Sequence, residues 1–351
     1  MFNPEYRLTN KIVQMLTGIA EGRAVIERAR LLPKQELRLR RQALIRMTHS
    51  STAIEGNRLN AKEVEAVADR KKVDAPERDI YEVQNYLDAL KYIQTVVEKK
   101  QSMSKQVILR IHKYVTNKTL RPEASGHYRS GSVYIARNYQ DGRREVIYTA
   151  PDAKDVATLM DALIDWVQKS IDEGVDPVIA AGIVHQEIAA IHPFVDGNGR
   201  TARALATLLL YQRGYDFRQL FALEDFYNTD RPAYYAAINI GETYQARRTD
   251  FTPWLEYFVK GFKEEIDQVK HTVMNLAVKK LDTDINSQVF LEKDQIAILD
   301  FMETMGRITV TDVIDIVRCP RRTAQLYMQK LKQLKMIKQI GKARATYYTL
   351  R

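Results

Sequence analysis

This sequence contains a single cysteine, Cys319. A single cysteine excludes an intramolecular disulfide framework and favours a reducing compartment. No apolar run approaches the ~20 residues that a membrane-spanning helix requires, and the segment 1–5 lacks the apolar core of a secretory signal peptide. We therefore expect a soluble cytoplasmic protein without a membrane partner.

Helix-breaking residues are scarce as well. The 351 residues include only 10 prolines and 15 glycines, and this composition favours a mainly helical protein of two or three domains. Apolar residues recur at helical spacing through most of the chain. The segments that this spacing predicts to be helical are 18–30, 34–54, 60–68, 77–97, 104–116, 152–171, 177–191, 198–214, 223–246 and 252–274.

The segment 126–148 interrupts the helical pattern. Two β-prone triplets, 133–135 and 146–148, flank Asp141-Gly142, and this arrangement predicts a β-hairpin. Such a hairpin would be a lid or a peptide-docking edge, or else an ordinary surface hairpin. The sequence favours neither of these two interpretations over the other.

Acidic residues are absent after Asp315, and the segment 294–351 has 11 lysines and arginines against 5 acids. Helices predicted at 295–305, 310–317 and 320–334 precede β-prone runs at 336–340 and 346–350. This order indicates a winged helix-turn-helix domain whose third helix would read DNA. Its charge suits nucleic acid or an acidic protein partner. The basic side chains on the third helix and the wing are Arg321, Arg322, Lys330, Lys332, Lys335, Lys338, Lys342 and Arg344.

The richest chemistry lies in the run His-Pro-Phe-Val-Asp-Gly-Asn-Gly-Arg-Thr-Ala-Arg at 192–203. A histidine can accept a proton near neutral pH, which suits His192 to acid–base chemistry. Asp196 can bind a hard divalent cation such as Mg²⁺. The run joins two predicted helices.

The second half of this run suits an anion. Gly197 and Gly199 let backbone N–H groups approach closely, and the helix that follows adds its positive N-terminal end. Arg200 and Arg203 share one face of that helix, where both can contact phosphate oxygens. We therefore predict a site for phosphate chemistry.

Three other motif interpretations fail on context or spacing. The segment 197–202 fits the dinucleotide fingerprint formally, but it follows a helix rather than a strand. No P-loop sequence is present. His185, Glu187 and His192 do not have the spacing of a zinc motif.

The run 192–203 resembles the Fic family, whose pattern His-Pro-Phe-x-Asp/Glu-Gly-Asn-Gly-Arg-x-x-Arg it matches at every fixed position. The helical segment from about 80 to 260 resembles the Fic fold. The resemblance implies transfer of AMP from ATP to a Ser, Thr or Tyr hydroxyl of a target protein. Gly199 stands where Doc-like kinases carry lysine, and this difference favours AMP transfer.

The resemblance also implies roles for individual residues. His192 would be the general base, Asp196 the Mg²⁺ ligand, and Arg200 and Arg203 the ligands of the β- and γ-phosphates. Pro193 and Phe194 are expected to pack. The implied nucleotide-binding residues are Asp196, Gly197, Asn198, Gly199, Arg200, Thr201, Ala202, Arg203 and, as the adenine-side aromatic, Tyr234. The implied flap, which docks the target, contains Val133, Tyr134, Ile135 and Ala136.

Glu55 is unusual because a carboxylate at a helix C-terminus opposes the helix dipole and would favour an arginine from elsewhere. A solvated glutamate is the simpler interpretation. The segment 51–57, with Ser51, Glu55 and Asn57, resembles the inhibitory motif Ser/Thr-x-x-x-Glu-Gly/Asn-Asn of Fic proteins that a preceding helix inhibits. The resemblance implies that Glu55 pairs with Arg203 in the space of the γ-phosphate.

We expect an N-terminal helical region at 1–110 with the inhibitory helix at about 34–56, a Fic core at 111–274 with a flap at 131–149, a linker at 275–293 and a winged helix at 294–351. The leading hypothesis is an autoinhibited protein adenylyltransferase that uses ATP and Mg²⁺ and also modifies itself. One alternative is a DNA-binding regulator whose Fic domain senses nucleotide. Another is a Fic enzyme that removes AMP or uses a different nucleotide. The target and a homodimer are left open.

Overall fold

The structure is a computed structural model, and it describes residues 2–138, 143–278, 291–341 and 346–351. Helices dominate it, as the composition predicts. None of the described helices is long and apolar enough to cross a membrane. The helices before the C-terminal region are α1 (Asn10–Arg28), α2 (Pro33–Ile54), α3 (Ala61–Ala68), α4 (Glu77–Glu98), α5 (Lys105–Val115), α6 (Ala153–Asp172), α7 (Pro177–Ile191), α8 (Asn198–Gln212), η1 (Phe217–Gln219), α9 (Leu223–Thr229), α10 (Arg231–Ile238) and α11 (Thr252–Val278).

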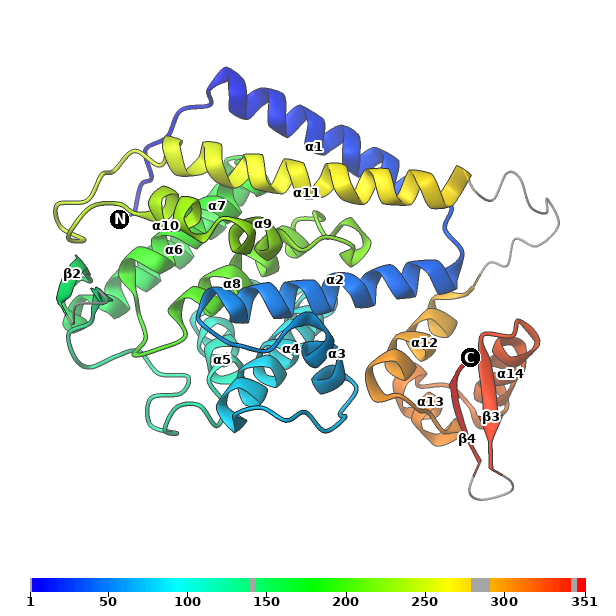
Figure 1. Cartoon of the computed structure of the whole chain (residues 1–351). Coiled ribbons are helices and arrows are strands. Elements are labelled where there is room, and N and C mark those ends of the chain that lie inside the picture. The colour runs from blue at the N-terminus through cyan, green and yellow to red at the C-terminus, as the bar shows by residue number, and fades with distance from the viewer. Residues whose placement is uncertain (1, 139–142, 279–290, 342–345) are drawn as a thin grey trace.

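Helix α7 lies at the centre of the bundle. Nearly all of its residues are buried, and a helix that is apolar on every side belongs inside a core. It packs against α6, α8 and α11, while α1 lies along the outer side of α11. The chain turns back after α7 into α8, so the loop 192–197 joins two buried helices (Figure 1).

Local signals account for most helix boundaries. Asn60 caps α3 by accepting hydrogen bonds from the next residues, and the Glu63 side chain completes the predicted capping box. The first helix begins at Asn10 rather than near residue 18, because Thr9 caps it by accepting from the Ile12 N–H. The predicted helix 223–246 is wrong. It breaks at Asp230 (φ −137°, ψ 78°), which then caps α10.

The predicted β-hairpin is confirmed. Strands β1 (Tyr134–Asn138) and β2 (Arg144–Thr149) pair antiparallel, with an irregularity between Ile135 and Ala136. The expected turn at 141–142 lies outside the described residues. A parallel bridge joins Thr149 to Thr243 on the far side of β2. In the described part of the chain, the outer edge of β1 therefore has no partner strand.

The C-terminal residues form a separate cluster of α12 (Lys293–Met305), α13 (Val310–Val317), α14 (Arg321–Gln333), β3 (Ile337–Ile340) and β4 (Tyr347–Leu350). The two strands pair antiparallel. A small apolar core holds these elements together. The predicted wing residues Lys342 and Arg344 lie outside the described residues.

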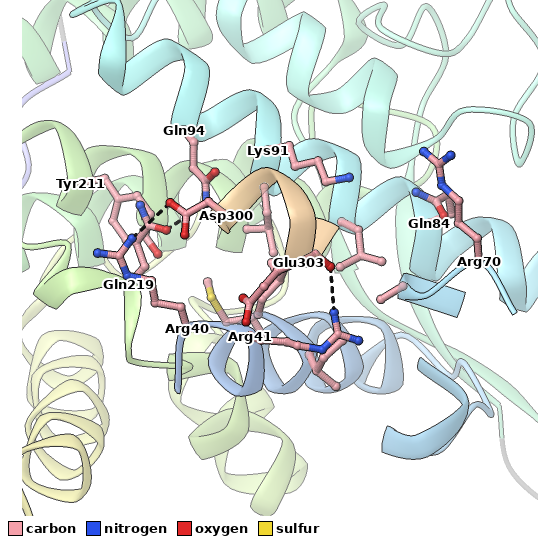
Figure 2. Close-up of a pocket in the computed structure, with 16 residues that line it drawn as sticks. Arg40, Arg41, Arg70, Gln84, Lys91, Gln94, Tyr211, Gln219, Asp300 and Glu303 are labelled. Carbon is pink, nitrogen blue, oxygen red and sulfur yellow. Dashed lines mark hydrogen bonds and ion pairs between the residues drawn. The ribbon is translucent and has the colours of Figure 1, made fainter. Parts of the chain in front are cut away.

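Helix α2 connects the two parts of the molecule, since it runs across the bundle and reaches α12 at its N-terminal half (Figure 1). Leu37 of α2 is buried in the C-terminal core. Arg40 forms an ion pair with Asp300 at 3.6 Å, and Arg41 donates to the Glu303 carbonyl at 3.2 Å. Figure 2 shows Arg40, Arg41, Asp300 and Glu303 among the residues that line a cavity between α2, α4 and α12. The volume of this cavity is about 120 Å³.

Candidate active site

His192 ends α7 in the left-handed conformation, with φ 50°. Its Nδ1 lies 3.2 Å from the Ala189 carbonyl. Because a carbonyl only accepts, Nδ1 carries the proton, and Nε2 keeps a lone pair. Burial lowers the pKa of His192 below its ordinary value. The ring is therefore neutral at neutral pH and can accept a proton.

The loop after His192 is held by its own side chains. The Asn198 amide donates to the Phe194 carbonyl and accepts from the Phe194 N–H, both at 2.9 Å. The Phe194 ring is buried and stacks on His112 at 3.7 Å, which confirms the packing role predicted for Phe194. The oxygen and the nitrogen of the Asn198 side-chain amide thus both hold the loop. Only the backbone of Asn198 is left to contact an anion.

Asp196 points away from the core beside the start of α8. Its Oδ1 accepts from the Gly197 N–H at 2.6 Å, and its Oδ2 accepts from Arg78 at 3.3 Å. The side chain keeps 39% of its surface exposed. Mg²⁺ is commonly bound by one or two carboxylates together with substrate phosphates. A lone accessible carboxylate next to an anion site fits that ligand set.

Arg200 has buried nitrogen atoms that make no hydrogen bond to any described residue. Only 2% of its side chain is exposed, and it lies 3.5 Å from Glu82 and 3.8 Å from Asp196. Its Nε and Nη1 make no hydrogen bond within the described part of the chain. Leaving buried donors unsatisfied is costly, so an anion bound at the start of α8 would stabilise this side chain.

Arg203 is held by helix α2 and Glu55 through its Nε and Nη2 atoms. Its Nη2 contacts the Glu55 carboxylate and the Ser51 carbonyl, each at 2.8 Å, and its Nε donates to the Ser51 hydroxyl at 2.9 Å. Only 1% of the Arg203 side chain is exposed. Glu55 raises the pKa of Arg203 against the opposing effect of burial. The ion pair expected from the sequence is present.

Gly199 allows Glu55 to come this close. A Cβ on Gly199 would lie 2.1 Å from Glu55 Oε1, so the Glu55 carboxylate would have to move, and 3.2 Å from Arg203 Nη1. The Glu55 carboxylate thus lies against the backbone at the start of α8. Helix N-termini attract anions, so this carboxylate lies where a phosphate group would also bind.

The two neighbouring tyrosines of α10 differ in exposure. Tyr234 is 2% exposed, and its hydroxyl lies 3.0 Å from His185 Nε2. Tyr235 is 49% exposed and donates to the Ile54 carbonyl of α2 at 3.0 Å. A cavity of about 790 Å³ between α10 and the hairpin is lined by Ile147, Arg231, Tyr235, Asn239, Glu242 and Arg248. Tyr234 as the adenine-side residue stays a prediction, and its burial weighs against it.

The remaining predicted residues are divided between core and surface. Thr201 and Ala202 are fully buried, on the bundle side of α8. Asn57 donates to the Asp79 carbonyl and to Glu82, so it holds the turn after α2. In the hairpin, Tyr134 and Ile135 are exposed, at 49% and 38%, while Val133 and Ala136 are partly buried.

Sequence reasoning missed two residues that hold the base loop. Arg129 donates to the His192 carbonyl at 2.8 Å. His112 accepts from the Gly126 N–H through Nδ1, so its Nε2–H donates to the Asp196 carbonyl at 3.0 Å. Both act on backbone atoms. A backbone acceptor leaves no pattern in the sequence, and no motif could have indicated these residues.

Comparison with known proteins identifies the domain that carries this site. Residues 102–210 match the model of the Fic/DOC family. A protein adenylyltransferase Fic of Nematostella vectensis is 29% identical over 261 residues, which cover 72% of this chain and 55% of that protein. One from Drosophila willistoni is 29% identical over 57% of this chain and 36% of its own length. This chain thus spans about half or less of these relatives.

A solved structure extends the likeness to the whole chain. A Fic family protein from Desulfovibrio desulfuricans G20 aligns with a TM-score of 0.64 and 25% sequence identity. The alignment covers 100% of this chain and 98% of that one. The likeness therefore includes the C-terminal cluster that follows the Fic domain.

Proposed function

We propose that this chain is a protein adenylyltransferase that moves AMP from ATP to a Ser, Thr or Tyr hydroxyl of a target protein. One observation carries the proposal: the free Nε2 of His192 lies in the loop that leads into the anion-binding start of α8. The curated relatives described above, which are named protein adenylyltransferases, support it. Residues 131–149 serve as the flap, whose free β1 edge would pair with the target backbone.

The chemistry follows from these groups. His192 Nε2 takes the proton of the attacking hydroxyl, the oxygen forms a bond to the α-phosphorus, and pyrophosphate leaves. The N–H groups at the start of α8 and the unpartnered donors of Arg200 hold the phosphates. Mg²⁺ bound by Asp196 would neutralise phosphate charge. We assign adenine to the cavity between α10 and the hairpin, where the exposed Tyr235 takes the place of the buried Tyr234 as the adenine-side aromatic.

Helix α2 holds this enzyme in an inhibited state. The γ-phosphate of ATP requires Arg203, whose donors are already bound to Glu55 and Ser51. The Glu55 carboxylate also occupies the space beside Gly199. ATP would therefore bind in a pose that is not aligned for transfer, until α2 moves.

The test is the Glu55→Gly variant incubated with ATP labelled at the α-phosphate. We expect self-modification, and modification of lysate proteins, to rise by at least about tenfold, because Arg203 becomes available to ATP. Adding His192→Ala to this variant should abolish the labelling while ATP binding persists. Equal labelling of wild type and Glu55→Gly would contradict the inhibition. No labelling by either protein, with ATP bound, would contradict the transferase.

The C-terminal cluster supports a second function, DNA binding by a winged helix. Ala324, Met328 and Leu331 bury one face of α14. The residues 316–351 contain ten lysines and arginines and no acid. A segment with this excess of positive charge suits the phosphate backbone. The side chains exposed on the other face of α14 are Arg321, Arg322, Gln325, Leu326, Gln329 and Lys332.

A gel shift with the full chain and duplex DNA tests this second function. Binding should weaken as salt rises, because bound cations are released. The double variant Arg321→Gln, Arg322→Gln should bind at least about tenfold more weakly and with a smaller salt slope. The matched control is Lys99→Gln, Lys100→Gln, which removes two exposed charges just after the end of α4. Equal loss in both double variants would contradict a site on α14.

A further inference from the structure

Arg129 connects the catalytic loop to the flap through carbonyl groups. It lies between α5 and β1 and is only 4% exposed. Its side chain donates to four backbone oxygens: His192 at 2.8 Å, Gly131 at 2.8 Å, Pro151 at 2.6 Å and Ile191 at 3.4 Å. Its own N–H donates to the Pro193 carbonyl at 2.9 Å. No carboxylate hydrogen-bonds to it in the described part of the chain.

The four acceptors belong to two parts of the site. Gly131 precedes β1 and Pro151 follows β2, so they mark both ends of the flap. Ile191 and His192 form the end of α7. A guanidinium presents its donors in a rigid plane, and a set of bonds to one such plane fixes the distances between the bonded groups. The flap and the base are therefore held in one geometry by one side chain.

His192 also depends on this contact for its backbone conformation. A non-glycine residue with φ near +50° is strained and persists only where its surroundings hold it. Arg129 holds the His192 carbonyl and places a positive charge at the negative C-terminal end of α7. The ring orientation that puts Nδ1–H on the Ala189 carbonyl follows from this backbone.

We propose that Arg129 is a positioning residue that sets the flap relative to the Nε2 atom of His192. The proposal rests on the adenylyltransferase function proposed above. A target strand that pairs with β1 then presents its hydroxyl at a fixed distance from the base. An error of about 1 Å in such a placement costs about 100-fold in rate. Arg129 itself touches neither the nucleotide nor the reacting oxygen.

The first measurement does not require AMP transfer. The full chain is labelled with ¹⁵N-histidine, and the His192 signals are assigned with His192→Gln. At pH 8 the wild type should show a single tautomer protonated at Nδ1. In Arg129→Lys and Arg129→Gln we expect a mixture of tautomers, because the backbone of His192 is released. An unchanged single tautomer in both variants would overturn the proposal.

The second measurement uses AMP transfer in the Glu55→Gly background. Adding Arg129→Lys, which keeps the charge, should lower kcat for self-modification by at least about tenfold and leave KM for ATP within about twofold. An unchanged kcat would overturn the proposal. If Glu55→Gly transfers no AMP at all, the proposed function fails, while the tautomer measurement still decides the role of Arg129.

Arg213 provides a matched control. Its partly buried guanidinium also donates to carbonyls, those of Val167 and Val175, and to the Ser170 hydroxyl, remote from the His192 loop. Arg213→Gln should lower the melting temperature as Arg129→Gln does, but leave the His192 tautomer and kcat unchanged. If Arg213→Gln changed both readouts equally, Arg129 would be a stability residue only, and the proposal would be overturned.

Discussion

At the scale of single residues, the protonation state of His192 would set the pH range in which the proposed base can accept a proton. Burial lowers the pKa of His192, and nearby Arg129 lowers it further, while Glu55 and Asp196 raise it. The imidazole is neutral at pH values above this lowered pKa and can accept a proton. When the pH falls below the pKa, the ring is protonated and can no longer act as a base. The net direction is downward from the ordinary value of 6.5.

We predict that kcat/KM for AMP transfer by Glu55→Gly is flat from pH 7 to 8 and falls on an acid limb below pH 6.5. Removal of Glu55 also removes a negative charge that raises the pKa of His192, so the limb moves lower still. The measurement is self-modification with labelled ATP from pH 5 to 9. An acid limb at or above pH 6.5 would show that His192 is not the base or is not buried during the reaction.

The sequence indicated the motif residues but not how each is used. His192, Glu55 and Arg203 could be predicted because each lies in a short run of residues that resembles a known motif. The partnerships of Asn198 with Phe194, of His112 with Asp196 and of Arg129 with four carbonyls could not. In each contact a side chain bonds backbone atoms, and any residue type supplies a backbone carbonyl. His112 and Arg129 reach their partners only when α5, α7 and the flap pack.

At the scale of elements, α2 is held in place along its length, not only at Glu55. Arg46 bonds Glu265 at 2.9 and 3.0 Å and also bonds Asp225. The Ser50 hydroxyl donates to the same Asp225. Glu265 is 2% exposed, so its carboxylate depends on Arg46 for charge compensation.

We predict that Arg46→Gln both destabilises the protein and activates it. The substitution leaves Glu265 buried without its cation, and we expect a loss of about 2 kcal/mol in the free energy of unfolding, less than for a fully buried pair because Arg46 is partly exposed. AMP transfer should rise because α2 is held less firmly. Urea unfolding and labelling by α-labelled ATP measure the two effects.

Arg38→Gln is the control for this prediction, since Arg38 lies exposed on the same helix. It should change neither stability nor transfer by a measurable amount. If Arg46→Gln destabilised the protein without raising AMP transfer, the contacts of Arg46 with Asp225 of α9 and Glu265 of α11 would have no part in keeping Glu55 at Arg203.

Elements followed from local sequence signals wherever those signals were strong. Apolar spacing and caps predicted α3, α7 and α8, because these features act within a few residues. The break at Asp230 was missed, since the apolar pattern continues through it and only the capping geometry of Asp230 and the following Pro232 reveals two helices. The docking of α12 on α2 was also missed, because contacts across 260 residues have no local signal.

At the scale of the whole molecule, helix α2, which we propose to be inhibitory, has a second attachment in the C-terminal cluster. Leu37 lies 18 residues before Glu55, about 27 Å along a helix that rises 1.5 Å per residue. Leu37 is buried in the core formed by α12, α13 and α14, and Arg40 and Arg41 contact α12 beside it (Figure 2). A rigid helix transmits a displacement at one end to the other.

We predict that Leu37→Ser, which removes this attachment, raises AMP transfer several-fold when Glu55 is present. In the Glu55→Gly background the same substitution should have no further effect, because the inhibitory contact is already lost. The four proteins of this cycle are compared by labelling with ATP. Equal activation in both backgrounds would mean that the C-terminal cluster acts on the Fic domain by a route other than α2. If activation by Leu37→Ser instead depends fully on Glu55, a ligand that moves the C-terminal cluster, such as DNA bound to α14, would affect the active site through Leu37 and Glu55.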